Sequence, residues 1–317
     1  MTRFKGLRID EILVEMRIFI LIGVLFIILG FVAPSFYSVN NFLSVFQNIS
    51  LEGIIMIGMT LLIIMCEMDL SVGAVMSFSC YCCIMFQPHG VIPAVLVALA
   101  ASAFVGLMNG VIVIKAKVSS IPATLGMMVL INGLVFLLTG NKSIPGQNEN
   151  FIKIAGFKML GISMLIWIFI ILVIIFAIIL ARTKFGRDVY AVGGNKTAAL
   201  FSGISPERIK IIVFILTGVL AGVAGIMMAS KLNIASGLLG QQTAFMVITA
   251  VLLGGVSLGG GEGSIPKALQ GMVLIGLLSN AMQFLKLPNP LQSIITGSIL
   301  IAILATDAIK IRKRQFE

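Results

Sequence analysis

Charged side chains are scarce in this sequence. Asp, Glu, Lys and Arg make up 11% of its 317 residues, whereas 59% are hydrophobic and the mean hydropathy is +1.14. An average soluble domain carries about 25% charged residues, because it must cover its surface with polar groups. The shortage excludes a soluble enzyme and a disordered regulator and indicates an integral membrane protein. The net charge of +10 does not indicate nucleic-acid binding, since the basic residues border apolar runs instead of forming one patch.

Groups that perform chemistry are also few. The single histidine, His89, lies in a Gln-Pro-His-Gly turn, and the four cysteines have neither the spacing of a zinc site nor that of a disulfide framework. The nearest approach to a phosphate-binding loop, residues 193–197, lacks the glycine directly before the lysine. We therefore expect no catalytic residue, no metal site and no cofactor on this chain, so any ATP that drives it must be bound by a partner.

Carboxylates are missing from the interiors of the predicted spans. Glu52, Glu67, Asp69 and Asp307 all fall at predicted span ends, where they can reach water or cap a helix. Ion-coupled carriers and proton pumps usually keep an ionisable residue in mid-membrane. This pattern makes an ion-coupled carrier the weaker alternative, although neutral side chains and backbone carbonyls can also bind Na⁺.

The apolar residues form runs of the length that crosses a membrane. A bilayer core needs about 20 apolar residues per helix. The sequence predicts an all-α polytopic protein with about ten spans, at residues 18–34, 50–66, 70–86, 91–114, 118–139, 159–181, 210–230, 242–258, 265–285 and 289–307. The runs 70–86 and 242–258 are short and rich in Gly and Ser, so we expect them to be tilted, broken or re-entrant.

The basic residues predict the orientation of these spans. With the N-terminus in the cytoplasm, only five of the 22 basic residues fall in outer loops and the other 17 face inward. Both termini are therefore predicted to be cytoplasmic. We expect a short N-terminal segment (1–17), one membrane domain (18–309) and a basic tail (310–317), with the longest inner loop at 182–209.

The inner loop 182–209 contains signals for a separate short helix. Gly193 and Gly194 are predicted to break the chain, Asn195 to cap about two helical turns over 196–202, and Gly203 to end them. Ser205, followed by a proline, starts the next span. Such a helix would present Ala198, Ala199, Leu200 and Phe201 to a cytoplasmic partner; the alternative is an ordinary connector.

At this loop the sequence becomes recognisable. The run FGRDVYAVGGNKTAALFSGI resembles the signature loop of permease subunits of ribose-type ATP-binding-cassette sugar importers. Further matches follow the same order along the chain: DLSVG at 69–73, GxxNG at 106–110, PxTLG at 122–126, and LGGVSLGGGxG at 253–263, which continues to Asn280. The resemblance covers about residues 40–310.

The resemblance implies how such a chain would work. It would be one of two transmembrane subunits in a bacterial inner membrane, served by two cytoplasmic ATPase subunits that bind ATP and magnesium and by an extracytoplasmic substrate-binding protein. The second permease subunit could be identical or a paralogue. Contacts with the ATPase are implied for these residues: Gly186, Arg187, Asp188, Gly193, Gly194, Asn195, Ala198, Ala199, Leu200 and Phe201.

One segment departs from the family pattern. An acidic pair usually precedes the Gly254-Gly255 motif in this family, and here Ala244 and Met246 stand in its place. The segment at 265–267, Ile-Pro-Lys, also replaces small residues. These changes bear on the solute and on contacts with partners, not on the membrane or coupling assignments.

Neutral polar residues and glycines are the remaining candidates. A path for a neutral sugar needs hydroxyl and amide groups that bind weakly. Candidate path residues, each of which could instead join two helices, are Asn109, Thr124, Asn132, Asn280, Gln283 and Gln292. Glycines that allow either close packing or a gate hinge are Gly254, Gly255, Gly259 and Gly260. The sequence thus favours an importer permease for a monosaccharide or small polyol over an ion-coupled carrier or facilitator, and over a structural or sensory subunit.

Overall fold

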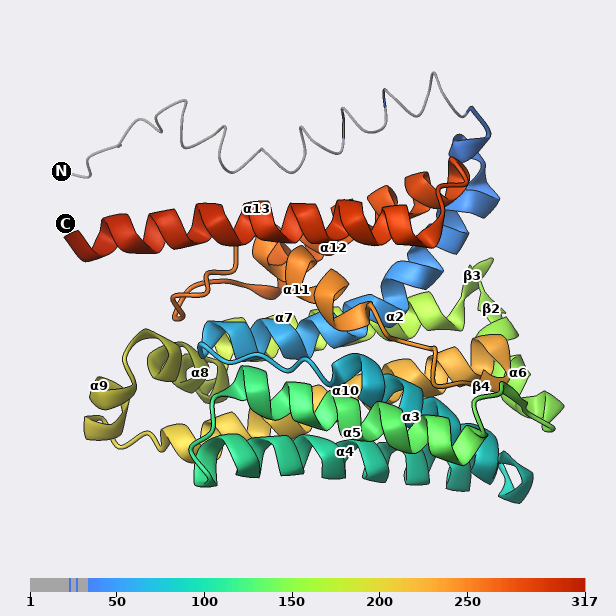
Figure 1. Cartoon of the computed structure of the whole chain (residues 1–317), viewed down its shortest axis with the longest axis horizontal. Coiled ribbons are helices and arrows are strands. Elements are labelled where there is room, and N and C mark those ends of the chain that lie inside the picture. The colour runs from blue at the N-terminus through green and yellow to red at the C-terminus, as the bar shows by residue number, and fades with distance from the viewer. Residues whose placement is uncertain (1–22, 24–26, 28–33, 317) are drawn as a thin grey trace.

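The fold is a bundle of helices that lie side by side along one direction (Figure 1). The computed structural model describes Gly23, Ile27 and residues 34–316, with side chains from Phe36 to Thr306 beyond the first two. The predicted span 18–34 and the N-terminal segment 1–17 therefore lie outside the described residues, apart from isolated positions. The main helices are α2 (Val39–Ile64), α3 (Val72–Phe86), α4 (Val91–Lys115), α5 (Ser120–Thr139), α7 (Met164–Arg182), α10 (Pro206–Leu232), α11 (Thr243–Leu253), α12 (Ile265–Phe284) and α13 (Asn289–Phe316).

Seven of the described helices are long and apolar enough to cross a membrane: α2, α4, α5, α7, α10, α12 and the 289–306 part of α13. The two runs predicted to be incomplete are indeed short, since α3 has 15 residues and α11 has 11. Helix α11 ends at Leu253 instead of continuing to 258, because the glycine-rich loop 254–264 follows it. An all-α polytopic membrane protein is confirmed.

Several predicted boundaries are wrong. Helix α2 begins at Val39, eleven positions before the predicted 50, because the Ser38 hydroxyl caps it and polar residues in its first turns had hidden the start. Helix α13 continues to Phe316, so the basic residues from 310 extend a helix instead of forming a separate tail.

Short elements occupy the two ends of the bundle. At one end lie the 3-10 turns η1 (Pro34–Tyr37) and η2 (Gln87–His89), and α6 (Glu149–Gly156). Two antiparallel ladders lie there too: β1 (Ile144–Pro145) pairs with β4 (Ile234–Ala235), and β2 (Lys158–Met159) pairs with β3 (Ile162–Ser163). At the opposite end are α8 (Lys184–Gly194), α9 (Lys196–Phe201) and the end of α13 (Figure 1). In the predicted topology the first end is extracytoplasmic and the second cytoplasmic.

The core is built around α2, α3 and α10. The second half of α2 is fully buried, and α10 packs against α2, α3 and α4. Small residues allow the closest approach: a Cβ on Gly106 of α4 would meet the carbonyl oxygen of Phe214, and one on Gly218 of α10 would meet that of Ser102. Van der Waals packing of this kind holds helices together in lipid, where no hydrophobic force acts between them.

Candidate functional site

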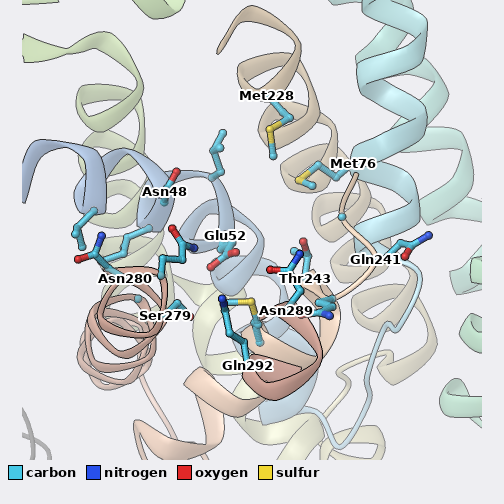
Figure 2. Close-up of a pocket in the computed structure, with 18 of the residues that line it drawn as sticks. Asn48, Glu52, Met76, Met228, Gln241, Thr243, Ser279, Asn280, Asn289 and Gln292 are labelled. Carbon is cyan, nitrogen blue, oxygen red and sulfur yellow. The ribbon is translucent and has the colours of Figure 1, made fainter. Parts of the chain in front are cut away.

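A cavity of about 610 Å³ opens among the outer halves of the central helices. It is bounded by the first half of α2, the start of α3, the last turns of α10, the segment 238–242, α11, the second half of α12 and the start of α13. Figure 2 shows side chains from these elements converging on one space. The polar residues that line it are Asn48, Glu52, Gln241, Gln242, Thr243, Ser279, Asn280, Gln283, Asn289 and Gln292.

Three of the six candidate path residues lie at this cavity: Asn280, Gln283 and Gln292. Asn280 and Asn41 of α2 exchange two hydrogen bonds of 3.1 Å through their side-chain amides, which joins α12 to α2. The Gln292 amide donates to the carbonyl oxygen of Leu287 at 2.8 Å, so its own oxygen remains available at the cavity. Both arrangements leave part of each amide for a solute.

The other three candidates lie elsewhere. The Asn109 amide donates to the carboxylate of Asp69 at 3.1 Å and to the hydroxyl of Ser71 at 2.8 Å, which joins α4 to the segment before α3. Thr124 accepts a hydrogen bond from the Leu70 amide at 3.0 Å. Neither residue lines the described cavity, and neither does Asn132 on α5. For Asn109 and Thr124 the contacts are those of helix-to-helix packing.

The structure moves Glu52 from a predicted span end into a helix, whereas Asp69 stays between two helices. Because α2 starts at Val39, Glu52 lies in the middle of that helix and lines the cavity. Asp69 is 1% exposed, and its Oδ1 accepts hydrogen bonds from the amide and the hydroxyl of Ser71 at 2.8 and 2.6 Å. The prediction of a span end is therefore wrong for Glu52. Asp69 does lie at the start of α3 and accepts from a backbone amide there, although it is buried from water.

Sequence reasoning missed most of the cavity lining. Besides Glu52 it overlooked the polar run 241–243 before α11, as well as Asn48, Ser279 and Asn289. The Gln-Gln-Thr run was a usable signal, since it directly precedes the apolar segment 244–253. Met246, at one of the two positions where the family pattern has a carboxylate, lines the cavity with a thioether, whereas Ala244 is buried.

The inner loop forms two short helices that pack on the end of the bundle. Asn195 caps α9 as predicted, with its side-chain oxygen accepting from the Ala198 amide at 2.9 Å, and Gly203 ends the helix at φ +80°. Gly193 and Gly194 do not break the chain, however, because they form the last turn of α8, which Thr183 caps. Ala198 is exposed on α9 and its neighbour Ala199 is not.

The exposed face of α9 is apolar. Leu200 is 60% exposed and Phe201 is 87% exposed, whereas Ala199 is 3% exposed and packs inward. The prediction that Ala199 belongs to the presented surface is therefore wrong. On α8, Arg187 is exposed, Asp188 is half-buried and Gly186 is buried. Adjacent exposed apolar side chains such as Leu200 and Phe201 mark a protein contact more often than a single exposed one does.

Helix α8 also touches the glycine-rich loop and the end of α2. The Tyr190 hydroxyl donates to the carbonyl oxygen of Gly263 at 2.7 Å, and burial raises the pKa of Tyr190, so the hydroxyl keeps its proton at neutral pH. A Cβ on Gly193 would collide with the carbonyl oxygen of Ile64. The same oxygen accepts from the Gly261 amide at 2.8 Å. Three backbone segments thus meet here, and the Cys66 thiol lies beside them, in contact with the Gly193 carbonyl oxygen.

The four candidate gate or packing glycines lie in or beside this loop. A Cβ on Gly254 would collide with the carbonyl oxygen of Lys267 in α12, so this glycine permits close packing of α11 and α12. Gly255 and Gly260 have φ of +93° and +76°, and the Gly259 amide donates to the Ser257 hydroxyl at 3.2 Å. The contacts fit a tightly packed turn; they do not test the hinge.

The described residues contain no group of three or more His, Cys, Asp and Glu side chains that could hold a metal ion. Of the four cysteines, Cys66 is exposed and the other three are buried as free thiols. The polar groups at the cavity are amides, hydroxyls and one carboxylate, that of Glu52. These groups suit weak binding of a polar solute.

Comparisons with known proteins identify the family of this chain. A family model described as "Branched-chain amino acid transport system / permease component" matches residues 41–304. A ribose import permease protein of Haemophilus influenzae is 35% identical to this chain, and the match covers 98% of both proteins. A ribose import permease protein of Escherichia coli K12 is 34% identical, and the match covers 93% of this chain and 94% of the relative. An L-arabinose ABC transporter permease protein of Azospirillum brasilense is 34% identical over 92% of this chain and 87% of that protein. No solved structure matches the chain.

The matches extend from α2 to α13 and so include the cavity, both short inner helices and the glycine-rich loop. The relatives are bacterial, and the apolar helices agree with a multi-pass protein of the bacterial inner membrane. This chain belongs to the permease component family of these transport systems.

Proposed function

We propose that this chain forms the translocation path of an ATP-binding-cassette importer for a monosaccharide or a related small polyol. The observation that carries the proposal is the pairing of a polar outer cavity with an exposed apolar inner helix at the other end of the same bundle. The relatives named as ribose and arabinose permeases support a pentose-like solute.

The chemistry of the cavity fits such a solute. Apart from Glu52, its polar lining consists of amides and hydroxyls, which can both donate to and accept from sugar hydroxyls. Few of these groups are buried deeply enough to hold a ligand tightly, and a path must release what it binds. Selectivity would then be shared with an extracytoplasmic binding protein.

The energy would come from ATPase subunits that dock on the inner end. Phe201 and Leu200 would enter a pocket of the ATPase, and movement of α9 would pass through α8 to Ile64 and Gly263. Those two residues adjoin α2 and α12, whose outer halves line the cavity. A second permease subunit would complete the assembly. Glu52 within a span is a feature that ion-coupled carriers share, but the relatives of this chain are named as ABC-type and sugar import permeases, which supports the importer.

The docking surface can be tested with one variant and a matched control. Phe201→Glu should abolish copurification with the cognate ATPase and ATP-dependent solute uptake, because a charge would replace the exposed ring. Leu160→Glu is the control: Leu160 is 86% exposed, close to the 87% of Phe201, but lies in the outer β2–β3 turn. Normal ATPase binding by Phe201→Glu, with both variants inserted in the membrane, would contradict the coupling assignment.

A further inference from the structure

One carboxylate stands out in the cavity. Glu52 is the only ionisable residue among the described residues that line it; the remaining polar residues there are neutral. Figure 2 shows its carboxylate pointing into the space between Gln292, Ser279 and Thr243, which come from three different helices. A solute in this cavity would therefore meet the Glu52 oxygens.

The nearby lysine leaves this carboxylate unpaired. Lys231, in the last turn of α10, donates to the side-chain oxygen of Asn48 at 2.7 Å. Asn48 precedes Glu52 by one turn of α2, so Lys231 lies near the carboxylate without touching it. Within the part of the chain that the structure describes, the ion pairs join other residues, Lys210 with Glu67 and Lys115 with Glu207. Lys231 thus contacts a residue that lines the cavity, whereas the Glu52 carboxylate lies in the cavity itself.

We propose that Glu52 determines which solutes the cavity accepts: it takes polyhydroxylated solutes without negative charge and rejects their anionic analogues, such as sugar acids and sugar phosphates. The inference rests on the proposed function, because it names the substrate class of the same cavity. Two oxygens of one carboxylate can accept from neighbouring hydroxyls, a charge-assisted bond stronger than one to an amide. The same charge repels an anion in a confined, poorly solvated space.

The charge of the cavity can be measured without transport. In a Cys66→Ser chain, which removes the exposed native thiol, Ser279→Cys places a thiol in the cavity. We would compare its reaction rates with a cationic (trimethylammonium) and an anionic (sulfonate) methanethiosulfonate reagent. A unit charge about 10 Å away changes the local concentration of a monovalent reagent about fourfold at an effective dielectric constant of about 40, and more at lower values. The cation-to-anion rate ratio should therefore fall about tenfold or more in Glu52→Gln.

Matched variants exclude trivial explanations. Glu149→Gln removes an exposed carboxylate at the start of α6, outside the cavity, and should leave the ratio unchanged. Lys231→Gln removes a positive charge and should raise the cation-to-anion rate ratio. Glu52→Asp keeps the negative charge and should keep the ratio, which shows that a change at position 52 alone does not alter it. The chain without Ser279→Cys gives the background rate of the buried native thiols. An unchanged ratio in a folded Glu52→Gln chain would overturn the proposal.

The solute class is tested by protection of the same thiol. Millimolar ribose should slow the reaction of Ser279→Cys, whereas ribonate, its carboxylate analogue, should do so only after Glu52→Gln. Equal protection by both solutes in the chain with Glu52 would overturn the proposal. If neither solute protected while the rate ratio still depended on Glu52, the cavity would be charged as inferred but would not admit the sugar, and the proposed function would fail instead.

Discussion

Asp69 and Glu52 are both carboxylates inside the protein, but their surroundings differ. Every polar contact of Asp69 is with a neutral donor, from Ser71 or from Asn109, and these bonds fix the non-helical segment before α3 against α4. Glu52 faces a cavity instead. A buried carboxylate that is fully hydrogen-bonded stabilises one conformation, whereas one at a cavity is available to a ligand.

We expect Asp69→Asn to destabilise the fold. The new amide would place donor against donor at Asn109, at a cost of about 1–3 kcal/mol for the lost and unsatisfied groups. The thermal midpoint in detergent should fall by several degrees. The double variant Asp69→Asn with Asn109→Asp restores a donor opposite an acceptor and should recover part of the loss. An unchanged midpoint in Asp69→Asn would contradict this assignment.

Residue-level features could be predicted where they depend on near neighbours in the chain. The caps at Asn195 and Gly203 are local, so their residue types sufficed. Asn109 could not be assigned, because its partner Asp69 is 40 positions away, and Asn280 pairs with Asn41 across 239 positions. Sequence periodicity carries no information about which distant polar groups meet.

At the scale of elements, α8 is the part that joins the inner surface to the bundle. The sequence predicted α9 but not α8, since a helix ending in two glycines contradicts local preference and is tolerated here for its close contact. Likewise α2 was predicted too short, because its first turns contain Asn residues that face α12 or the cavity instead of lipid, Asn41 and Asn48 among them. Polar residues that face a cavity or another helix lower the hydropathy of a span, so the start of the span is missed in the sequence.

Gly193→Ala should therefore uncouple the transporter, and Gly194→Ala should not. The methyl group at 193 would collide with the Ile64 carbonyl and force α8 away from α2, whereas at 194 the nearest atom, the Gly261 Cα, is 4.0 Å away. Both variants gain the same helix propensity, so their comparison isolates the collision. We expect the 193 variant to lose most ATP-driven uptake while still binding the ATPase. Equal uptake by the two variants would show that this contact does not carry the coupling.

At the scale of the whole molecule, α9 lies at one end of the bundle (Figure 1), and the cavity is lined by the halves of α2 and α12 that are farther from it. The number of spans and the positions of both termini stay predictions, since seven described helices meet the length and hydropathy of a span and α3 and α11 are shorter.

Uptake by the assembled transporter in proteoliposomes should follow ATP and not an ion gradient. With the ATPase subunits and binding protein present, ATP on the cytoplasmic side should drive accumulation that a protonophore and a sodium ionophore leave unchanged. The permease chain alone should accumulate nothing under either gradient. Gradient-driven uptake by the chain alone would support an ion-coupled carrier and contradict the importer.

The residues that line the cavity and the backbone segments that meet at Ile64 are separate sets, although α2 contributes to both. In the proposed importer, solute selection and coupling would therefore use different ends of one helix. Exchange of side chains near Glu52 could then alter the solute while the close backbone contact between Gly193 and Ile64 stays unchanged. A change of solute specificity would then need no change in the contact between α8 and α2.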